Sequence, residues 1–288
     1  MATLRGVLVR STRVRPAILA AFLLLPLTEP TANAQVAPST APGASAAERA
    51  GRPRRVDPFA GQKRIRALVV TGGCCHDYAT ETKVLMDMMA TEAPVDWTVV
   101  LETEGGSNAT RTKASLYKQP NWAAGYDIVV HNECYANVDD GDFVRNVVAG
   151  HSGGVPAVVI HCAMHSYRAL ESDEWRELLG VTTRRHTQQH NIQVKVTDAG
   201  HPIMTGFRQD WVTPKDELYV IEKLWPNAKA LATAVSPEDG AEYPLIWVND
   251  YRGARVFGTT VGHGPETWDD STFRDLLVRG FKWAVNRQ

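Results

Sequence analysis

Residues 65–78 read IRALVVTGGCCHDY, and this stretch decides the fold. The apolar, β-branched run over residues 65–71 predicts a buried strand. Gly72 and Gly73 follow it and let the backbone turn sharply. A helix is expected over residues 80–91, because four apolar side chains recur there at helical spacing: Val84, Leu85, Met88 and Met89. Strand, tight turn and helix in this order are the building unit of an α/β domain.

The same unit recurs along the chain. Strands are predicted at residues 97–101, 128–131 and 157–161, and a helix at residues 139–149 ends at the glycines that follow it. Alternating strands and helices imply a parallel, doubly wound sheet with right-handed crossovers. The expected fold class is therefore α/β, a three-layer sandwich with a mainly parallel sheet.

The second half of the domain is less regular. We expect a short helix at residues 175–179, a closing helix at 271–286, and strands at 192–197, 218–221, 228–232, 245–249 and 255–260. Residues 250–254, DYRGA, form a plausible hairpin turn between the last two strands. This predicts an antiparallel extension of the parallel sheet.

Histidines stand where a reaction site would be built. Four of the nine histidines follow or end an apolar run: His76, His131, His161 and His263. Ligands of open α/β sheets bind outside the carboxyl ends of the strands, so we expect these imidazoles to converge on one crevice. Histidine titrates near neutral pH and is the commonest metal ligand. The sequence thus predicts a polar, histidine-rich site.

Several of the histidines allow more than one interpretation. His76 beside Asp77 offers a base or metal ligand next to a carboxylate, or it caps the helix start. His161 precedes Cys162 in a strand-to-helix turn, which raises the further hypothesis of a Cys–His nucleophile pair. His186 and His190 lie four residues apart, but polar neighbours suggest an exposed loop.

The segment TPKDELY, residues 213–219, places two carboxylates before a strand. Near histidines, Glu217 can serve as a general acid or base, or orient an imidazole. The alternative is a pair of solvated loop carboxylates. No dinucleotide-binding fingerprint and no P-loop occurs in the sequence.

The N-terminus predicts export. Arginines precede an apolar stretch at residues 17–27, and Ala32-Asn33-Ala34 fits the small-residue cleavage rule. Residues 1–34 are therefore expected to be a signal peptide cleaved after Ala34, with a periplasmic or secreted product. Residues 35–62 are rich in Ala, Pro, Ser and Gly and are expected to form a flexible linker, so residues 63–288 make up the α/β domain.

Charge and cysteine content narrow the function classes. Removing the four Arg and one Glu of residues 1–34 changes the formal charge from −1 to −4, with no basic patch to suggest nucleic acid and no apolar segment long enough to span a membrane. The four cysteines permit disulfides in an oxidising compartment, and buried apolar groups, a reactive thiol or a thiolate metal ligand remain alternatives: Cys74, Cys75, Cys134 and Cys162.

Together these pieces resemble the ThuA-like (trehalose-utilisation) family. The matching segments are VTGGCCHDY, YDIVVH, GGVPAVVIHCAMH, WRELLG, GHPIMTGF, DELY, PLIWVNDYRGARVFGTTVGH and LVRGFKWAV, which span about residues 64–286. The resemblance implies a flavodoxin-like fold similar to class I glutamine amidotransferase domains, and a link to carbohydrate metabolism. It places the family's marked residues at His76, His161, Asp216, Glu217 and His263. The doubled Cys74-Cys75 departs from the family, and no Cys–His–Glu triad pattern is recognisable.

Three functions compete at this point. The first is an exported enzyme acting on a sugar or keto-glycoside by hydrolysis, elimination or isomerisation, with His76, His161, Glu217 and His263 as catalytic residues. Its expected substrate-binding residues are Asp77, Tyr78, His131, Glu133, Asp216 and Tyr219. The second is a non-catalytic carbohydrate-binding module that stacks sugars on aromatic rings. The third is a metal-binding or redox protein, with a divalent transition metal, zinc above all, on His76, His161 and His263.

Overall fold

The computed structural model describes residues 57–102 and 109–286. The signal peptide predicted for residues 1–34 and the first part of the predicted linker, residues 35–56, lie outside the described residues. Within the described part of the chain, no helix combines the length and hydropathy that crossing a membrane requires.

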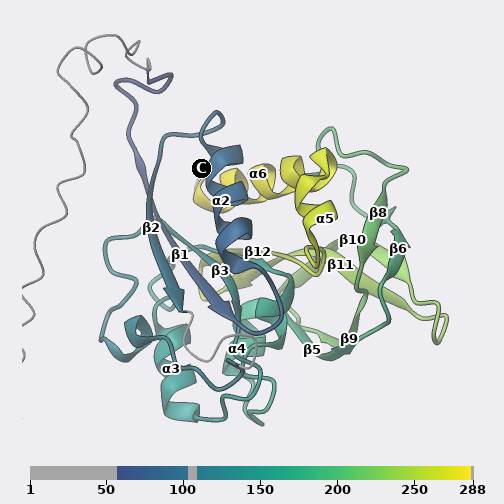
Figure 1. The fold of residues 1–288 in the computed structure, drawn as a ribbon, viewed down its shortest axis with the longest axis horizontal. Helices are drawn as coiled ribbons and strands as arrows, with labels where there is room; N and C mark the ends of the chain where they lie inside the picture. The colour runs from purple at the N-terminus through teal and green to yellow at the C-terminus, as the bar shows by residue number, and fades with distance from the viewer. Residues whose placement is uncertain (1–56, 103–108, 287–288) are drawn as a thin grey trace, which may run out of the picture. The chain divides into compact units, whose positions relative to one another are not determined.

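An eight-stranded sheet forms the centre of the domain, in the order β2-β1-β3-β4-β12-β11-β10-β7. Neighbouring strands run parallel from β2 to β12 and antiparallel from β12 to β7. The parallel strands are β1 (Ile65–Gly73), β2 (Val95–Glu102), β3 (Ile128–Cys134), β4 (Ala157–Ile160) and β12 (Ala254–Thr259). The extension is made of β11 (Glu242–Tyr251), β10 (Ala228–Val235) and β7 (Lys195–Val196). The predicted mainly parallel sheet with an antiparallel extension is confirmed (Figure 1).

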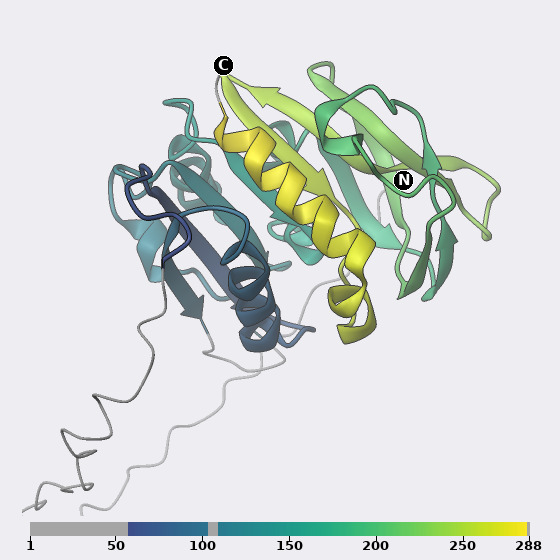
Figure 2. The same cartoon turned by 90° about the horizontal axis from the view of Figure 1, so that it is seen from above.

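Helices cover both faces of this sheet, which makes the three layers expected from the sequence. One layer contains α2 (Tyr78–Met89), α5 (Pro265–Asp269) and α6 (Ser271–Val285), and Figure 2 shows α2 and α6 running over the same face. The other layer contains α3 (Gly141–Ala149) and α4 (Glu174–Leu179). Because side chains alternate along a strand, Ala67 and Val69 pack with the first layer and Leu68 and Val70 with the second. Burial of each larger side chain, Leu68, Val69 and Val70, stabilises the fold by about 1.5–3 kcal/mol.

Short polar residues fix where the helices begin. Asp77 accepts a hydrogen bond from the backbone N–H of Thr80, and Asp140 does the same for Phe143. Each bond satisfies one of the N–H groups that a helix start leaves unpaired. The first of these caps lies directly after His76 in the chain.

The last predicted hairpin is present and tighter than expected. Tyr251 of β11 pairs with Ala254 of β12, so the turn consists of Arg252 and Gly253 alone. Both have positive φ angles, 55° and 82°. Two such residues in succession match the twist of the flanking strands, which is why two-residue hairpins favour them.

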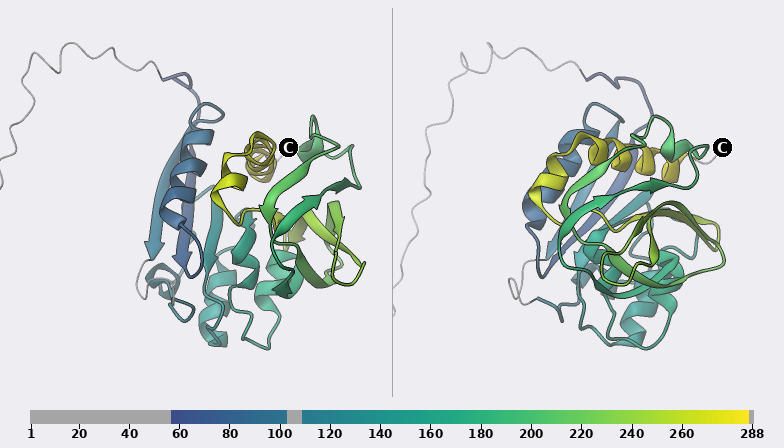
Figure 3. Two further views of the ribbon diagram at one scale, coloured as in Figure 1. Left: turned by 45° about the vertical axis from the view of Figure 1, so that its right-hand side comes forward. Right: turned by 90° about the vertical axis from the view of Figure 1, so that its right-hand side faces the viewer.

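Two small sheets continue the domain beyond the antiparallel strands (Figure 3). One pairs β5 (Val181–His186) with β9 (Tyr219–Leu224), and the other pairs β6 (His190–Gln193) with β8 (Val212–Asp216). Residues 57–102 and 109–286 also contain the short 3-10 helices η2 (Ser115–Lys118), η3 (His161–His165) and η4 (Pro202–Met204).

Three local predictions need correction. The strand expected at residues 128–131 runs on to Cys134, so His131 lies inside β3 rather than at its end. The strand expected at 192–197 is divided between β6 and β7, because its two halves hydrogen-bond to different sheets. The segment with His186 and His190, expected to be a loop, contains the end of β5 and the start of β6.

Candidate active site

Three of the four strand-end histidines come together beyond the carboxyl ends of the parallel strands. His76 follows β1, His161 opens η3 directly after β4, and His263 follows β12. One ring nitrogen of each lies within 4.8 Å of the others, a group we call the three-histidine cluster. The rings meet edge to face, with centroids 4.8 to 5.4 Å apart. The expected convergence therefore holds for three imidazoles.

Backbone carbonyls fix the tautomers of two of these rings. His161 Nδ1 lies 2.6 Å from the carbonyl oxygen of Thr260, and His76 Nδ1 lies 3.0 Å from that of His263. Because a carbonyl oxygen only accepts, each Nδ1 carries the proton and each Nε2 keeps its lone pair. Burial, followed by the neighbouring histidines, lowers the pKa of His76 to about 3. Burial likewise lowers the pKa of His161 to about 4, so both rings are neutral at pH 7.

Glu217 supplies a carboxylate to the cluster. Its Oε1 lies 3.2 Å from His263 Nδ1, and its Oε2 lies 3.6 Å from His161 Nε2. Burial alone would raise the pKa of Glu217, but the hydrogen bond with His263 and electrostatic interactions with His161, His186 and His263 outweigh it and lower the pKa to about 2. The same pairing raises the pKa of His263. Glu217 is therefore an anion held among imidazoles.

Asp216, the neighbouring carboxylate, holds the loop that carries His263. Its Oδ2 accepts hydrogen bonds from the backbone N–H groups of Gly262 and His263, at 3.0 and 3.2 Å, and from the hydroxyl of Thr267 at 2.8 Å. Asp216 is fully buried, and burial raises its pKa against the effect of these bonds. Its contacts are those of a residue that positions His263.

A pocket of about 850 Å³ opens over the cluster. Its lining includes His76 and His263, the glycines of the β1 loop, and the polar side chains of Glu81, Gln189 and Lys215. Glu81 Oε1 lies 3.9 Å from His76 Nδ1, and Glu81 Oε2 accepts a hydrogen bond from the side-chain amide of Asn132. Burial raises the pKa of Glu81 to about 7, so this second carboxyl is poised to exchange a proton near neutral pH.

The residues expected to bind substrate fall into different surroundings. Asp77 caps α2 and, like Tyr78, lines the pocket. The Tyr78 hydroxyl donates to the backbone carbonyl of Cys74. Tyr219 is fully buried and stacks on His165, with ring centroids 4.1 Å apart and an interplanar angle of 11°. Tyr219 also packs against the ring of His161, so it helps to position this member of the cluster.

His131 and Glu133 belong to a separate buried network on the α3 side of the sheet. His131 Nδ1 lies 2.9 Å from Glu133 Oε1, and its Nε2 lies 3.0 Å from the Nε2 of His151. The Tyr117 hydroxyl donates to Glu133. These side chains are fully buried and do not line the pocket over the cluster. Alternation along β3 is the reason, since His131 points to the face opposite to that of Asn132.

Sequence reasoning missed two groups and underrated a third. Glu81 lies within α2 among polar residues, where no pattern marks it, and Gln189 approaches His263 Nε2 at 2.6 Å from the β5–β6 connection. His186, interpreted as an exposed loop histidine, lies with its Nε2 3.5 Å from Glu217 Oε2. Only the His186–His190 spacing hinted at this segment, and His190 does not reach the cluster.

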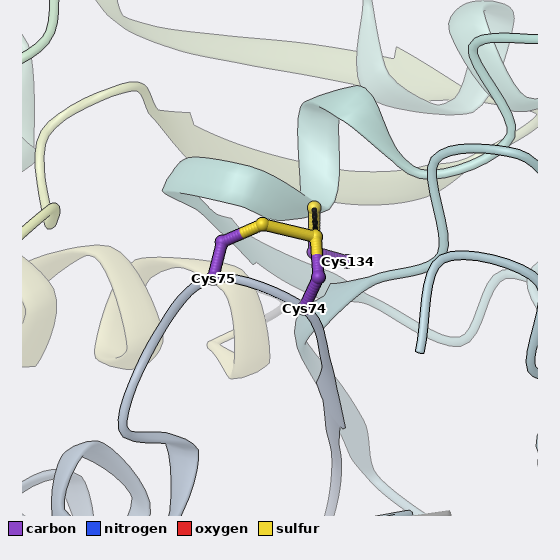
Figure 4. A group of neighbouring side chains, drawn as sticks. All are labelled: Cys74, Cys75 and Cys134. Atoms are coloured by element: carbon purple, nitrogen blue, oxygen red, sulfur yellow. Dashed lines mark hydrogen bonds between the residues drawn. A yellow bond between two sulfur atoms is a disulfide. The ribbon is translucent and has the colours of Figure 1, made fainter. Parts of the chain in front are cut away.

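The cysteines form two disulfides, Cys74–Cys75 and Cys134–Cys162, so Cys162 has no thiol to act as a nucleophile. Figure 4 shows the Cys74–Cys75 bond facing Cys134. The three sulfurs of Cys74, Cys75 and Cys134 lie close enough to suit a metal ion, but each is bonded in a disulfide and lacks the negative charge of a thiolate ligand.

Comparison with known proteins identifies the family and the fold of this chain. The family profile described as trehalose utilisation, ThuA, matches residues 66–284. The crystal structure of a ThuA-like protein from Parabacteroides merdae has a TM-score of 0.62 and 23% identity, covering 78% of this chain and 91% of that chain. A ThuA-like protein from Bacteroides uniformis has a TM-score of 0.60 and 16% identity, covering 78% and 93%. At these identities the likeness establishes the fold. No curated protein sequence matches the chain.

Proposed function

Because the chain belongs to the ThuA, or trehalose utilisation, family, we propose that it is an exported enzyme acting on a sugar or keto-glycoside at a metal ion held by the three-histidine cluster. The reaction is a hydrolysis, elimination or isomerisation. The family relationship supports a role in carbohydrate metabolism, and the geometry of the cluster supports the chemistry.

One observation carries the metal proposal. His161 Nε2 is buried and lacks a hydrogen-bond partner. It faces Glu217 Oε2 at 3.6 Å. On His161 the proton is already on Nδ1, so a lone pair faces a carboxylate, an arrangement that is repulsive without a positive charge nearby. A divalent cation bound to His161 Nε2 would satisfy this nitrogen and offset the charge of Glu217.

The donor set fits a first-row transition metal. Neutral imidazoles suit zinc, copper, iron and nickel, and catalytic zinc sites use three protein ligands with a fourth position open. Nitrogen ligands at about 2.0–2.1 Å in a tetrahedral site lie about 3.4 Å apart. The cluster, whose ligand atoms lie within 4.8 Å of one another, needs side-chain movements of about an ångström to close around an ion. The carbonyl oxygens that hold His76 and His161 already give both rings the required tautomer.

The surrounding residues supply the proton transfers. A bound metal ion would polarise a carbonyl or hydroxyl oxygen of the sugar. A ketone makes the neighbouring C–H bonds acidic, and Glu217, an anion paired with the pocket-lining His263, can draw such a proton through that ring. Glu81, on the pocket wall with a pKa of about 7, can return a proton to the product or leaving group.

The non-catalytic binding module receives less support. Sugar stacking needs exposed aromatic faces, and the five rings considered for it are at most 5% exposed: Tyr78, Tyr135, Tyr167, Tyr219 and Trp268. Tyr78 and Trp268 do border the pocket, but with little of their surface.

Two disulfides agree with an oxidising compartment and so with export.

The test is turnover on a panel of glycosides and 3-keto-glycosides with zinc, manganese, nickel, copper or iron supplied. We expect a member of the panel to be converted by the unaltered protein, with Glu217→Gln slower by about 10²–10⁴-fold. Glu222→Gln, which changes an exposed carboxylate of β9, is the matched control. Equal turnover by both variants would refute the role of Glu217, and tight sugar binding without product would favour the binding module.

A further inference from the structure

The two disulfides lie in contact with each other. Cys74 Sγ lies 3.8 Å from Cys134 Sγ, the pair joined by the dashed line in Figure 4. Neither sulfur of a disulfide carries a proton, so this approach is a sulfur–sulfur contact across which thiol–disulfide exchange can proceed. The four sulfurs therefore form one group that extends from the pocket into the protein.

The backbone is built to bring these sulfurs together. The N–H of Cys74 donates to the carbonyl of Cys134 at 3.2 Å. Gly73 has a φ angle of 99°, and a Cβ atom there would lie 2.3 Å from that same carbonyl oxygen. Only glycine allows the end of β1 to approach β3 this closely. Cys75 has a φ angle of 87°, an uncommon conformation for a side chain-bearing residue.

The four cysteine residues differ in exposure. Cys75 is exposed and lines the pocket, whereas Cys74 is 4%, Cys134 1% and Cys162 8% exposed. A reductant can therefore reach the Cys74–Cys75 disulfide far more easily than the buried Cys134–Cys162 disulfide. Cys162 directly follows His161, so the buried bond lies next to the three-histidine cluster.

We propose that the Cys74–Cys75 disulfide is a redox site that takes an electron pair from a dithiol and relays it to the Cys134–Cys162 disulfide. A thiolate of the dithiol attacks Cys75 Sγ and expels the Cys74 thiolate. Cys74 attacks Cys134 Sγ across the 3.8 Å contact, forms a Cys74–Cys134 disulfide and expels the Cys162 thiolate.

The cycle then closes. The second thiol of the reductant attacks its own sulfur in the mixed disulfide, which releases the Cys75 thiolate and the oxidised reductant. Cys75 attacks Cys74, restores the Cys74–Cys75 disulfide and expels the Cys134 thiolate. In total the dithiol loses two electrons and two protons, which reduce Cys134 and Cys162 to thiols.

The relay is tested on the full chain with dithiothreitol as the dithiol. After an acid quench and alkylation, mass spectrometry identifies which cysteines have become thiols. With one equivalent of reductant we expect alkylated Cys134 and Cys162 and an intact Cys74–Cys75 disulfide. Alkylated Cys74 and Cys75 beside an intact Cys134–Cys162 disulfide would overturn the relay.

The rate gives a second readout. Cys74→Ser/Cys75→Ser removes the exposed disulfide, and we expect reduction of Cys134–Cys162 to slow by about tenfold or more. Presence of the Cys134–Cys162 bond and an unchanged thermal unfolding transition show that this variant is folded. An unchanged rate of reduction in the folded variant would overturn the proposal.

A single substitution traps the intermediate. Cys75→Ser leaves a Cys74 thiol beside Cys134, so a Cys74–Cys134 linked peptide and a free Cys162 are expected without added reductant. Cys74→Ser is the matched control, in which the Cys134–Cys162 disulfide stays intact. A free Cys74 thiol in Cys75→Ser, with Cys134–Cys162 intact, would contradict the exchange step.

Discussion

His161 turns Nε2 toward Oε2 of Glu217 at 3.6 Å while Nδ1 of the same ring binds the carbonyl of Thr260 at 2.6 Å. The ring carries one proton at neutral pH, and this proton lies on Nδ1, which donates to the carbonyl oxygen of Thr260. The lone pair and the carboxylate then face each other in a buried site. This relationship distinguishes the cluster from a set of histidines that merely pack in a core, where each ring nitrogen would have a donor or acceptor of its own.

Asp216→Asn should loosen the loop that carries His263. Both oxygens of Asp216 accept backbone N–H groups, Oδ1 from Glu217 and Oδ2 from Gly262 and His263, so either orientation of the asparagine amide sets its NH₂ against a donor, and we expect a loss of about 2–4 kcal/mol in the free energy of unfolding. Urea unfolding measures the change, with Asp210→Asn as control because that side chain is 84% exposed. Equal stability of the two variants would show that Asp216 does not hold the loop.

Gly73→Ala should be more costly than Gly61→Ala. Both glycines have positive φ angles, but a Cβ at Gly73 would meet the Cys134 carbonyl at 2.3 Å, whereas one at Gly61 would meet nothing within 4 Å. Backbone strain of about 1–3 kcal/mol is common to both. Thermal unfolding should therefore separate the variants, and closely similar transitions would mean that β1 and β3 can move apart without loss.

Acid should destabilise the protein through its buried neutral histidines. Burial, and then the adjacent His131, lower the pKa of His151 from 6.5 to about 3, against the hydrogen bond to Val155. Above pH 6.5 the ring is neutral in both states. Between pH 6.5 and 3 the unfolded chain binds a proton that the native state excludes, so stability falls as the pH falls, by on the order of 4 kcal/mol at pH 3.

The measurement is the free energy of unfolding between pH 7 and 4 for His151→Asn. We expect a shallower decline with falling pH than in the unaltered protein, whatever the stability of the variant at pH 7. His190→Asn, at the start of β6, is the control for the loss of a histidine elsewhere in the fold. Parallel curves for all proteins would contradict a protonation penalty at His151.

The fold was predictable because its signals are local. Apolar runs and helical spacing marked the parallel strands and both long helices of the first layer, and the glycines after residue 71 marked the first turn. The divided strand at residues 192–197 was not predictable in this way. Its alternation of apolar and polar residues is the same whichever sheet it joins. The Trp211 carbonyl, which accepts a hydrogen bond from the backbone N–H of Val194, is distant in sequence.

The site was predictable only in part, for a geometric reason. A strand end places a side chain at the edge of the sheet, which brought His76, His161 and His263 together. His131 shows the limit, because three further residues of β3 turn a strand-end position into an interior one. The Cys134–Cys162 disulfide and the position of Glu81 near His76 depend on distances in the folded protein, which the spacing of residues in the sequence does not reveal.

The most direct test of the proposed metal site is elemental analysis of the protein after incubation with zinc, manganese, nickel, copper or iron and removal of free metal. We expect about one equivalent of a transition metal per chain. His161→Ala should lose it, while His201→Ala, whose ring instead packs on Trp283, should keep it. A protein that retains no metal, or a His161→Ala variant that retains as much as the unaltered chain, would contradict a metal ion on the three-histidine cluster.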